Sequence, residues 1–216
     1  MKGFAATTEL AWHYTDATRL LPLLHSKALK PSLGIPYCDE TPVVWLTRAN
    51  RFEPMALPMD RSAEPQKQKL LTPLALATLA NGLLRIGVAV DARLKTFSEW
   101  KVSVDFDHRN QVEVMQNAAI DMGSNPKDDW LISRKVIHQS RWQHLQIAFP
   151  ENVSDQGVQT WSEWDLQASY TRELLERAKE LPQCLDLDCN CCEPNRPLPT
   201  SNPLESGSLA KMIKQS

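Results

Sequence analysis

The sequence predicts an α+β domain in which helices flank a β-sheet. Short apolar runs of strand length, such as residues 84–90, alternate with stretches whose apolar residues recur at helical spacing, such as residues 111–120. Turn-forming residues separate these runs, and the 216 residues include 15 Pro and 7 Gly. A chain of this length buries a full core. We expect residues 1–182 to form one globular domain and residues 183–216, rich in Cys, Pro and Ser, to form a loosely ordered tail.

Composition narrows the class of protein. The 24 basic and 26 acidic residues give a formal charge of −2, which argues against a strongly basic nucleic-acid surface. Residues 1–9 lack the apolar core of a secretory signal. No apolar run approaches the ~20 residues that span a bilayer. Five Cys are an odd number and do not resemble a secreted disulfide framework. We therefore expect a cytoplasmic protein with no membrane partner.

The first strand delivers three polar side chains in a row. Leu10-Ala11-Trp12 is a short apolar run, and His13, Tyr14 and Thr15 follow it directly. Asp16 is placed to cap a helix at about residues 17–27. A polar triplet at the end of a strand begins the ligand cleft of many α/β and α+β enzymes. The alternative is that His13 is a hydrogen-bonded histidine of the core.

A second strand and a long irregular segment follow. The apolar run 43–47 predicts a strand buried on both faces, which ends at Thr47 and Arg48. Residues 49–70 break the pattern, and loops of this length usually carry function or are disordered. Within this segment, Glu53 lies in the sequence RFEPMA, which we expect to fold over the cleft.

The remaining elements follow the same two periodicities. Ser162 is placed to cap the longest amphipathic helix, and Gly123 to end the helix before it. Residues 70–79 fit a short helix and a continuous buried segment equally well, and residues 92–101 fit a helical turn or a short helix. The other predicted elements are a turn at 81–82, a strand at 84–90, a helix at 111–120, a strand at 130–133, a turn at 140–144, a strand at 145–149 and a helix at 162–181.

This order of elements, with His-Tyr-Thr on the first strand, an LKPS turn and Trp-Leu-Thr on the second strand, resembles the ADP-ribosyltransferase-like fold. The plan is most similar to the minimal bacterial branches, such as the DNA-targeting toxin transferases and the tRNA 2′-phosphotransferases. The resemblance covers about residues 8–150 and implies a split sheet, mixed or antiparallel, with flanking helices. A group of bacterial and phage sequences without assigned function is also similar, in the motifs WHYT, KALKPS, VVWLTRANRFEPMA, GSNPKDDWLIS and RW.

The resemblance implies NAD as substrate and places candidate residues. His13 matches the family residue that holds the ribose or phosphates, with Tyr14 and Thr15 beside it. Thr47 matches the hydroxyl residue near the nicotinamide, with Trp45 as a stacking wall. Asp129 stands where the family has its catalytic Glu, one methylene shorter, and Glu53 is the alternative acid. The basic residues expected to meet the diphosphate are Arg48, Arg51 and Arg85. For Arg85, pairing with a carboxylate is the favoured alternative.

Several functions remain open on the sequence alone. The first is transfer of ADP-ribose from NAD to a protein or nucleic acid, or hydrolysis of NAD. A carboxylate near the ribose would stabilise its oxocarbenium-like transition state. The second is a non-catalytic binding module of the same fold in a phage or bacterial interaction, which the Asp in place of Glu favours. The third is an RNA-cleaving toxin that uses His13 and an Arg.

Four Cys near the C-terminus are the one candidate metal site. Four thiolates bind zinc tetrahedrally, but zinc sites usually combine two separate Cys-x-x-Cys turns, which this spacing lacks. An unligated tail is therefore favoured over a zinc site. The four residues are Cys184, Cys189, Cys191 and Cys192.

Overall fold

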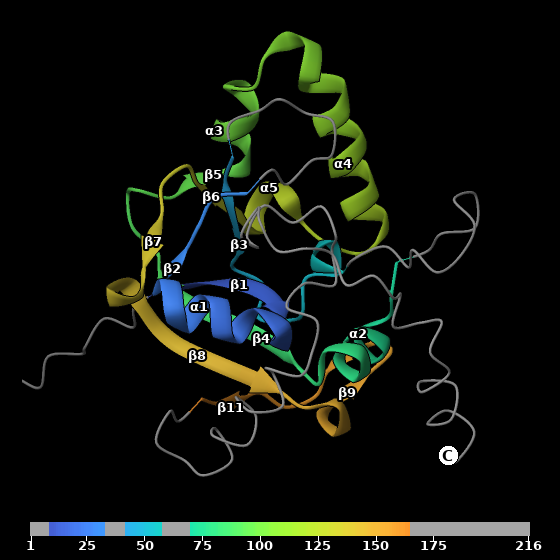
Figure 1. Ribbon diagram of the computed structural model, residues 1–216. Helices are drawn as coiled ribbons and strands as arrows, with labels where there is room; N and C mark the ends of the chain where they lie inside the picture. Colours follow the sequence, from blue (N-terminus) through green and yellow to red (C-terminus); the bar gives the residue numbers. More distant parts are fainter. Residues whose placement is uncertain (1–8, 33–41, 58–69, 165–216) are drawn as a thin grey trace, which may run out of the picture. The chain divides into compact units, whose positions relative to one another are not determined.

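Seven strands form one antiparallel sheet in the order β11-β8-β4-β1-β3-β6-β5 (Figure 1). The structure is a computed structural model that describes residues 9–32, 42–57 and 70–164. The expected α+β class is confirmed. The strands are β1 (Leu10–Asp16), β3 (Val44–Thr47), β4 (Leu83–Ala89), β5 (Lys95–Thr96), β6 (Trp130–Ser133), β8 (Trp142–Ala148) and β11 (Ser162–Glu163).

Two small sheets and five helices surround these strands. The small sheets pair β2 (Ala28–Leu29) with β7 (Ile137–His138), and β9 (Val153–Ser154) with β10 (Gly157–Val158). The helices are α1 (Leu20–Ser26), α2 (Pro73–Ala80), α3 (Phe97–Val102), α4 (Arg109–Asp121) and α5 (Pro126–Asp129). In Figure 1, α3 and α4 stand together at the top, at the end of the sheet that carries β5 and β6, whereas β8 and β11 lie at the bottom.

The pairing of β1 defines two faces of the sheet. Residues directly opposite each other in an antiparallel ladder point to the same side, and neighbours along a strand point to opposite sides. Trp12 pairs with Gly87 of β4 and with Thr47 of β3. We call the side that carries Trp12 and Tyr14 the Trp12 face, and the side that carries Ala11 and His13 the His13 face.

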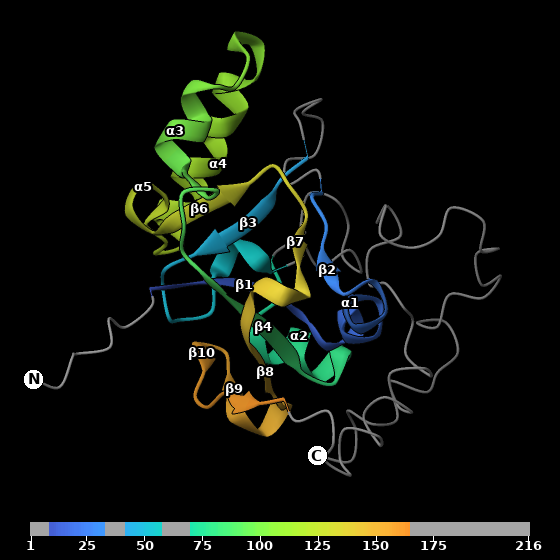
Figure 2. The ribbon, with the colours of Figure 1, turned by 90° about the vertical axis from the view of Figure 1, so that its left-hand side faces the viewer.

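Helices cover both faces. On the His13 face, Leu20 and Leu23 of α1 pack with Leu84 and Ile86 of β4, and the β2–β7 pair contributes to the same core cluster. Figure 2 shows α1 and β2 together on this flank, close to β7. The Trp12 face carries two clusters. One packs Trp12 and Tyr14 against α2, and the other packs Trp130 and Ile132 of β6 against α3 and α4. This arrangement leaves the segment 48–57 between the two clusters.

Local sequence explains where the helices start and stop. The Thr72 hydroxyl accepts a hydrogen bond from Ala75 N at 3.2 Å and caps α2, and Pro73 follows at its first position. Asn81 ends α2 in the left-handed conformation with φ 60°. Thr96 and Glu99 form a reciprocal capping box at the start of α3. These caps therefore fix where α2 and α3 begin and where α2 ends.

The structure corrects several predicted boundaries. The predicted helix 17–27 is a 3₁₀ turn at 17–19 followed by α1. The predicted turn at 140–144 and strand at 145–149 are largely one longer strand, β8. Ser162 does not cap a helix, because Ser162 and Glu163 form β11 and pair with Ile147 and Gln146 of β8. The rest of the helix predicted at 162–181, and the predicted tail at 183–216, lie outside the described residues.

No helix among residues 9–32, 42–57 and 70–164 is long and apolar enough to cross a membrane.

Candidate functional site

The sheet register separates the two residues on which the family resemblance depends most. Thr47 shares the Trp12 face, because it pairs with Trp12 of β1 and with Trp130 of β6. His13 is the next residue along β1 and therefore points to the opposite face, opposite Ile86 of β4. Three neighbouring strands lead to the three candidates: β1 carries His13, β3 carries Thr47, and Asp129 of α5 directly precedes β6. The side chains of His13 and Thr47 are nevertheless on different sides of the sheet.

His13 holds two strands together. Its Nδ1–H donates to the carbonyl oxygen of Trp45 at 2.9 Å, which joins β1 to β3 beyond the Trp12–Thr47 pair. Burial lowers the pKa of His13 below 6.5, and the hydrogen bond to Trp45 opposes that shift. The imidazole is therefore neutral at neutral pH, with its proton on Nδ1. Thr15 lies on the same face and is half-buried.

Thr47 and Arg48 fix the end of β3. Thr47 is only 2% exposed, and its hydroxyl accepts a hydrogen bond from Ala49 N at 3.1 Å. The Arg48 guanidinium donates to the Glu9 carboxylate at 2.6 Å and to the carbonyl oxygen of Asp128 at 3.1 Å. The Arg48 backbone N–H donates to the carbonyl oxygen of Asp129 at 2.8 Å. These contacts tie the start of segment 48–57 to the junction between α5 and β6.

The two candidate acids differ in their surroundings. Asp129 is half-exposed and is the last residue of α5, directly before β6, as the resemblance implies. Glu53 is 9% exposed, and its carboxylate accepts hydrogen bonds from the Ser124 hydroxyl, from Trp130 Nε1 at 3.1 Å and from Met55 N at 3.4 Å. These donors come from three different segments. Glu53 therefore links segment 48–57 to the loop before α5 and to β6, and it stabilises the fold as a hydrogen-bond acceptor.

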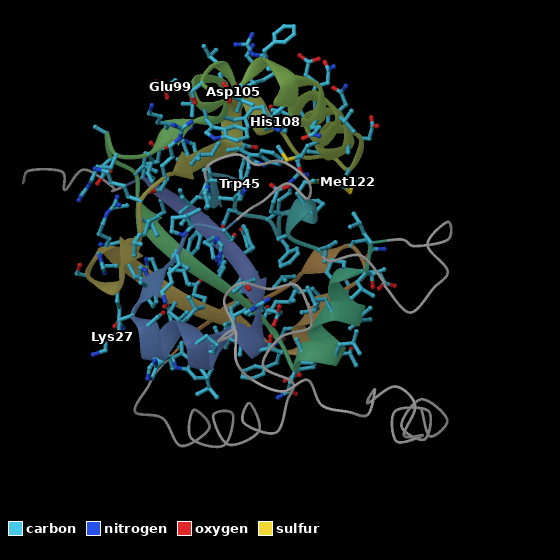
Figure 3. All side chains as sticks on the ribbon, turned by 45° about the horizontal axis from the view of Figure 1, so that its top comes forward. Lys27, Trp45, Glu99, Asp105, His108 and Met122 are labelled. Carbon is cyan, nitrogen blue, oxygen red and sulfur yellow. The ribbon has the colours of Figure 1, made fainter. Side chains whose placement is uncertain are left out.

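Trp45 belongs to an aromatic cluster on the Trp12 face. Its ring lies 5.1 Å from that of Trp100 and 5.5 Å from that of Trp130, centroid to centroid, both edge to face. Figure 3 shows Trp45 below Glu99 of α3 and below Asp105 and His108, which lie between α3 and α4. The indole of Trp45 is half-buried, so part of its surface is exposed beside Phe97, 6.5 Å away between ring centroids.

Arg85 is the most unusual residue of the Trp12 face. It is only 6% exposed, and its guanidinium carbon lies 4.0 Å from the ring centroid of Trp12 and 4.6 Å from that of Trp161. Its Nε–H donates to the side-chain oxygen of Gln146 at 2.6 Å, and Nη1 donates to the side-chain oxygen of Asn50 at 2.7 Å. These partners are neutral amides instead of the expected carboxylate. Burial is the main reason that the pKa of Arg85 is lowered.

Tyr14 completes this group. Its hydroxyl donates to the carbonyl oxygen of Ala49 at 3.0 Å, and its ring packs 5.3 Å from that of Phe52. Burial raises the pKa of Tyr14 to about 12, and Arg85 opposes the shift. Arg85 and the five residues around its guanidinium form one group, which we call the Arg85 cluster: Trp12, Tyr14, Asn50, Arg85, Gln146 and Trp161.

Further hydrogen bonds connect the Arg85 cluster to the edge strand β11. The side-chain amide of Gln146 donates to Glu163 Oε1 at 2.5 Å, and Nδ1 of His144 lies 2.8 Å from the same oxygen. The carboxylate of Glu163 favours the charged form of Arg85 through space. Of these residues only Arg85 and Tyr14 were predicted site residues. The alternation of β1, which puts Trp12 and Tyr14 together, is the sequence signal that would have indicated this face.

Arg51 and the Cys residues do not join the Arg85 cluster. The Arg51 guanidinium is exposed and hydrogen-bonds the carbonyl oxygen of Gly123. No group of three His, Cys, Asp or Glu residues placed to hold a metal ion occurs in the part of the chain that the structure describes. The predicted Cys cluster, residues 184–192, lies outside that part.

The first prediction concerns Glu53. Glu53→Gln replaces one acceptor oxygen by an amide donor that faces either the Ser124 hydroxyl or the Trp130 N–H. We expect the free energy of unfolding, measured by urea denaturation, to fall by about 1–3 kcal/mol. The matched control is Glu151→Gln, because Glu151 is exposed. Equal stabilities of the two variants would contradict the structural role of Glu53.

The second prediction concerns pH. Because the pKa of His13 is lowered in the fold, the unfolded chain takes up the proton first as the pH falls through 6.5. Stability should therefore fall below that pH, by at most about 1.4 kcal/mol per pH unit from this group. His13→Asn keeps a donor to Trp45 and removes the titration, so its unfolding free energy should depend less on pH between 7 and 5. Exposed His138→Asn should behave as the wild type, and a wild-type slope in His13→Asn would contradict this role.

In comparisons with known proteins, no family model matches the chain, and no curated protein or solved structure matches it. The observed architecture is an α+β fold with a seven-stranded antiparallel sheet.

Proposed function

We propose that this protein is a nucleotide-binding module of ADP-ribosyltransferase-like plan, which binds ligands of the NAD and ADP-ribose class on the Trp12 face without cleaving them. One observation carries the proposal. A nearly buried arginine lies between two indoles, 4.0 Å and 4.6 Å from their ring centroids, and neutral amides receive its hydrogen bonds. The adjacency of β1, β3 and β6 supports the plan of the fold.

The chemistry of the Arg85 cluster fits such a ligand. A buried cation without a directly bonded anion is costly, so a ligand that brings negative charge gains from meeting it. The planar guanidinium matches the oxygens of phosphate groups. Indole and phenol rings provide surfaces on which a base stacks. Trp12, Tyr14 and Trp161 supply three such rings around Arg85.

The residues expected to carry catalysis have other tasks. His13 lies on the opposite face and donates its Nδ1 proton to Trp45. Thr47 is buried, and its hydroxyl accepts from the backbone of Ala49. The carboxylate of Glu53 is engaged by Ser124 and Trp130. These contacts favour binding over catalysis.

The third prediction tests binding. Calorimetric titration with ADP-ribose and with NAD should show saturable binding to the wild type. Arg85→Gln should weaken the binding by at least about tenfold, since a charge-assisted bidentate contact is lost. Arg85→Lys should also weaken it, because the ammonium lacks the planar fork. Two controls should bind as the wild type: exposed Arg93→Gln, and His13→Asn on the opposite face. Absence of wild-type binding, or equal affinity in folded Arg85→Gln, contradicts the proposal.

A second candidate function, an NAD-dependent transferase, is favoured by one specific observation. Asp129 is half-exposed directly before β6, and its neighbour Trp130 pairs with Thr47. An acid in this place would stabilise the positive charge that develops on the ribose. The acceptor would be a protein or a nucleic acid, or water for hydrolysis.

The fourth prediction separates the two candidates. Incubation of the wild type with NAD, alone and with protein or RNA as acceptor, should release no nicotinamide above the buffer rate, as measured by chromatography. Release that Asp129→Asn abolishes and that Asp128→Asn leaves unchanged would establish the transferase instead. Asp128 is the matched control because it is exposed and adjacent in sequence.

A further inference from the structure

Trp161 covers the guanidinium on which the proposed ligand depends. Its ring centroid lies 4.6 Å from the Arg85 guanidinium carbon and 5.9 Å from the Tyr14 ring. We propose that Trp161 is a displaceable gate: its indole occupies the place of the ligand's base over Arg85, and a nucleotide with an aromatic base and a diphosphate replaces it. This inference rests on the proposed nucleotide-binding function and adds the residue that regulates access.

The opposite wall of the Arg85 cluster is fixed. Trp12 is 8% exposed and sits in the middle of β1, paired with residues of β3 and β4. Its ring lies against Gly87, where an added Cβ would come within 2.9 Å of Trp12 Cζ3. Strand pairing and the lack of a side chain at Gly87 thus hold the Trp12 ring tightly against the sheet. We therefore do not expect a ligand to displace Trp12.

The guanidinium keeps its place without Trp161. Gln146, which holds Nε, belongs to β8 and pairs with Arg85 across the ladder. Asn50, which holds Nη1, belongs to the segment that Glu53 and Tyr14 anchor. Removal of the Trp161 indole therefore leaves the Arg85 guanidinium held in place over the Trp12 ring. A ligand that binds such a preorganised site loses little free energy to ordering it.

The segment that carries Trp161 is held by few strand pairs. Trp161 precedes β11, an edge strand of two residues, whose described pairs are Ser162 with Ile147 and Glu163 with Gln146. The indole itself is half-buried and lies outside the regular strands. Trp164, which is buried on the His13 face, anchors the other side of this segment. On the side before Trp161, the Gln159 backbone N–H donates to the carbonyl oxygen of Asn152 at 2.8 Å. The chain at 160–161, between this bond and β11, can therefore swing while both stay in place.

Exchange of the indole for a base selects the class of ligand. A base restores the stacking that the indole loses, so the exchange alone changes the free energy little. A diphosphate adds the charge-assisted contact that the indole does not provide. A ligand that has the base and the diphosphate together should therefore open the gate, whereas a sugar phosphate without a base should leave Trp161 in place.

The fifth prediction is measured on two variants of the full chain. Trp161→Ala removes the competing indole, so ADP-ribose should bind about three- to tenfold more tightly than to the wild type in calorimetry. In 5-fluorotryptophan-labelled wild type, the ¹⁹F resonance that Trp161→Phe removes should shift when ADP-ribose is added. The same resonance should not shift with ribose 5-phosphate. Trp142→Phe, a half-buried residue of β8, is the control variant and should keep the ADP-ribose response.

The outcomes separate the gate from the proposed function. If ADP-ribose binds the wild type in an Arg85-dependent manner, but Trp161→Ala binds equally or more weakly, Trp161 is a fixed wall and the gate is wrong. A Trp161 resonance that ignores saturating ADP-ribose overturns the gate in the same way. If neither the wild type nor Trp161→Ala binds ADP-ribose, both the gate and the nucleotide-binding function are wrong.

Discussion

Arg85 is only 6% exposed on the Trp12 face of the sheet, and a buried cation requires compensation from its surroundings. Two indoles provide part of it through their electron-rich faces, and two amide oxygens provide directed hydrogen bonds. Gln146 also links the cation to an anion, because its side-chain amide donates to the carboxylate of Glu163. Several contacts on the Trp12 face place these compensating groups around Arg85. Gly87 makes room for Trp12, and Asn50 positions the segment 48–57 beside Tyr14.

The two faces of the sheet carry different kinds of side chain. The His13 face is a core against α1, in which the imidazole of His13 joins two strands as a neutral donor. The Trp12 face carries charge, aromatic surface and a half-buried tryptophan from the sheet edge. Both faces carry buried apolar clusters, and the Trp12 face adds a buried cation between aromatic rings. The proposed ligand site therefore lies one residue away, in sequence, from the histidine that the WHYT motif singles out.

Local sequence patterns predicted the helices and strands better than they predicted which strands pair with each other. The helical spacing of residues 112, 115 and 119 and the cap-forming Gly123 correctly predicted α4, and the apolar run before Arg48 correctly predicted β3. The placement of Asp129 directly before a strand was also correct. These features depend on neighbours in sequence. By contrast, Ser162 was predicted to cap a helix, but it pairs with Ile147 in a sheet edge, a contact that sequence periodicity does not encode.

The candidate site shows the same limit. Whether His13 and Thr47 share a face depends on the register of β1 against β3, which a one-residue shift would reverse. The partners of Arg85 come from positions 50 and 146, far apart in sequence, so the favoured carboxylate was a reasonable expectation and the observed amides were not predictable. Residue types gave the chemistry available to the protein, and the long-range register decided which side chains meet.

A crystal structure of the full chain with ADP-ribose would show directly whether the Trp12 face around Arg85 is the ligand site. We expect density for the ligand over Trp12, with phosphate oxygens within hydrogen-bond distance of the Arg85 guanidinium and Trp161 moved away from it. A saturated complex in which Trp161 remains stacked on Arg85 would contradict the gate alone. Ligand density on the His13 face, next to His13 and α1, would contradict the proposed site.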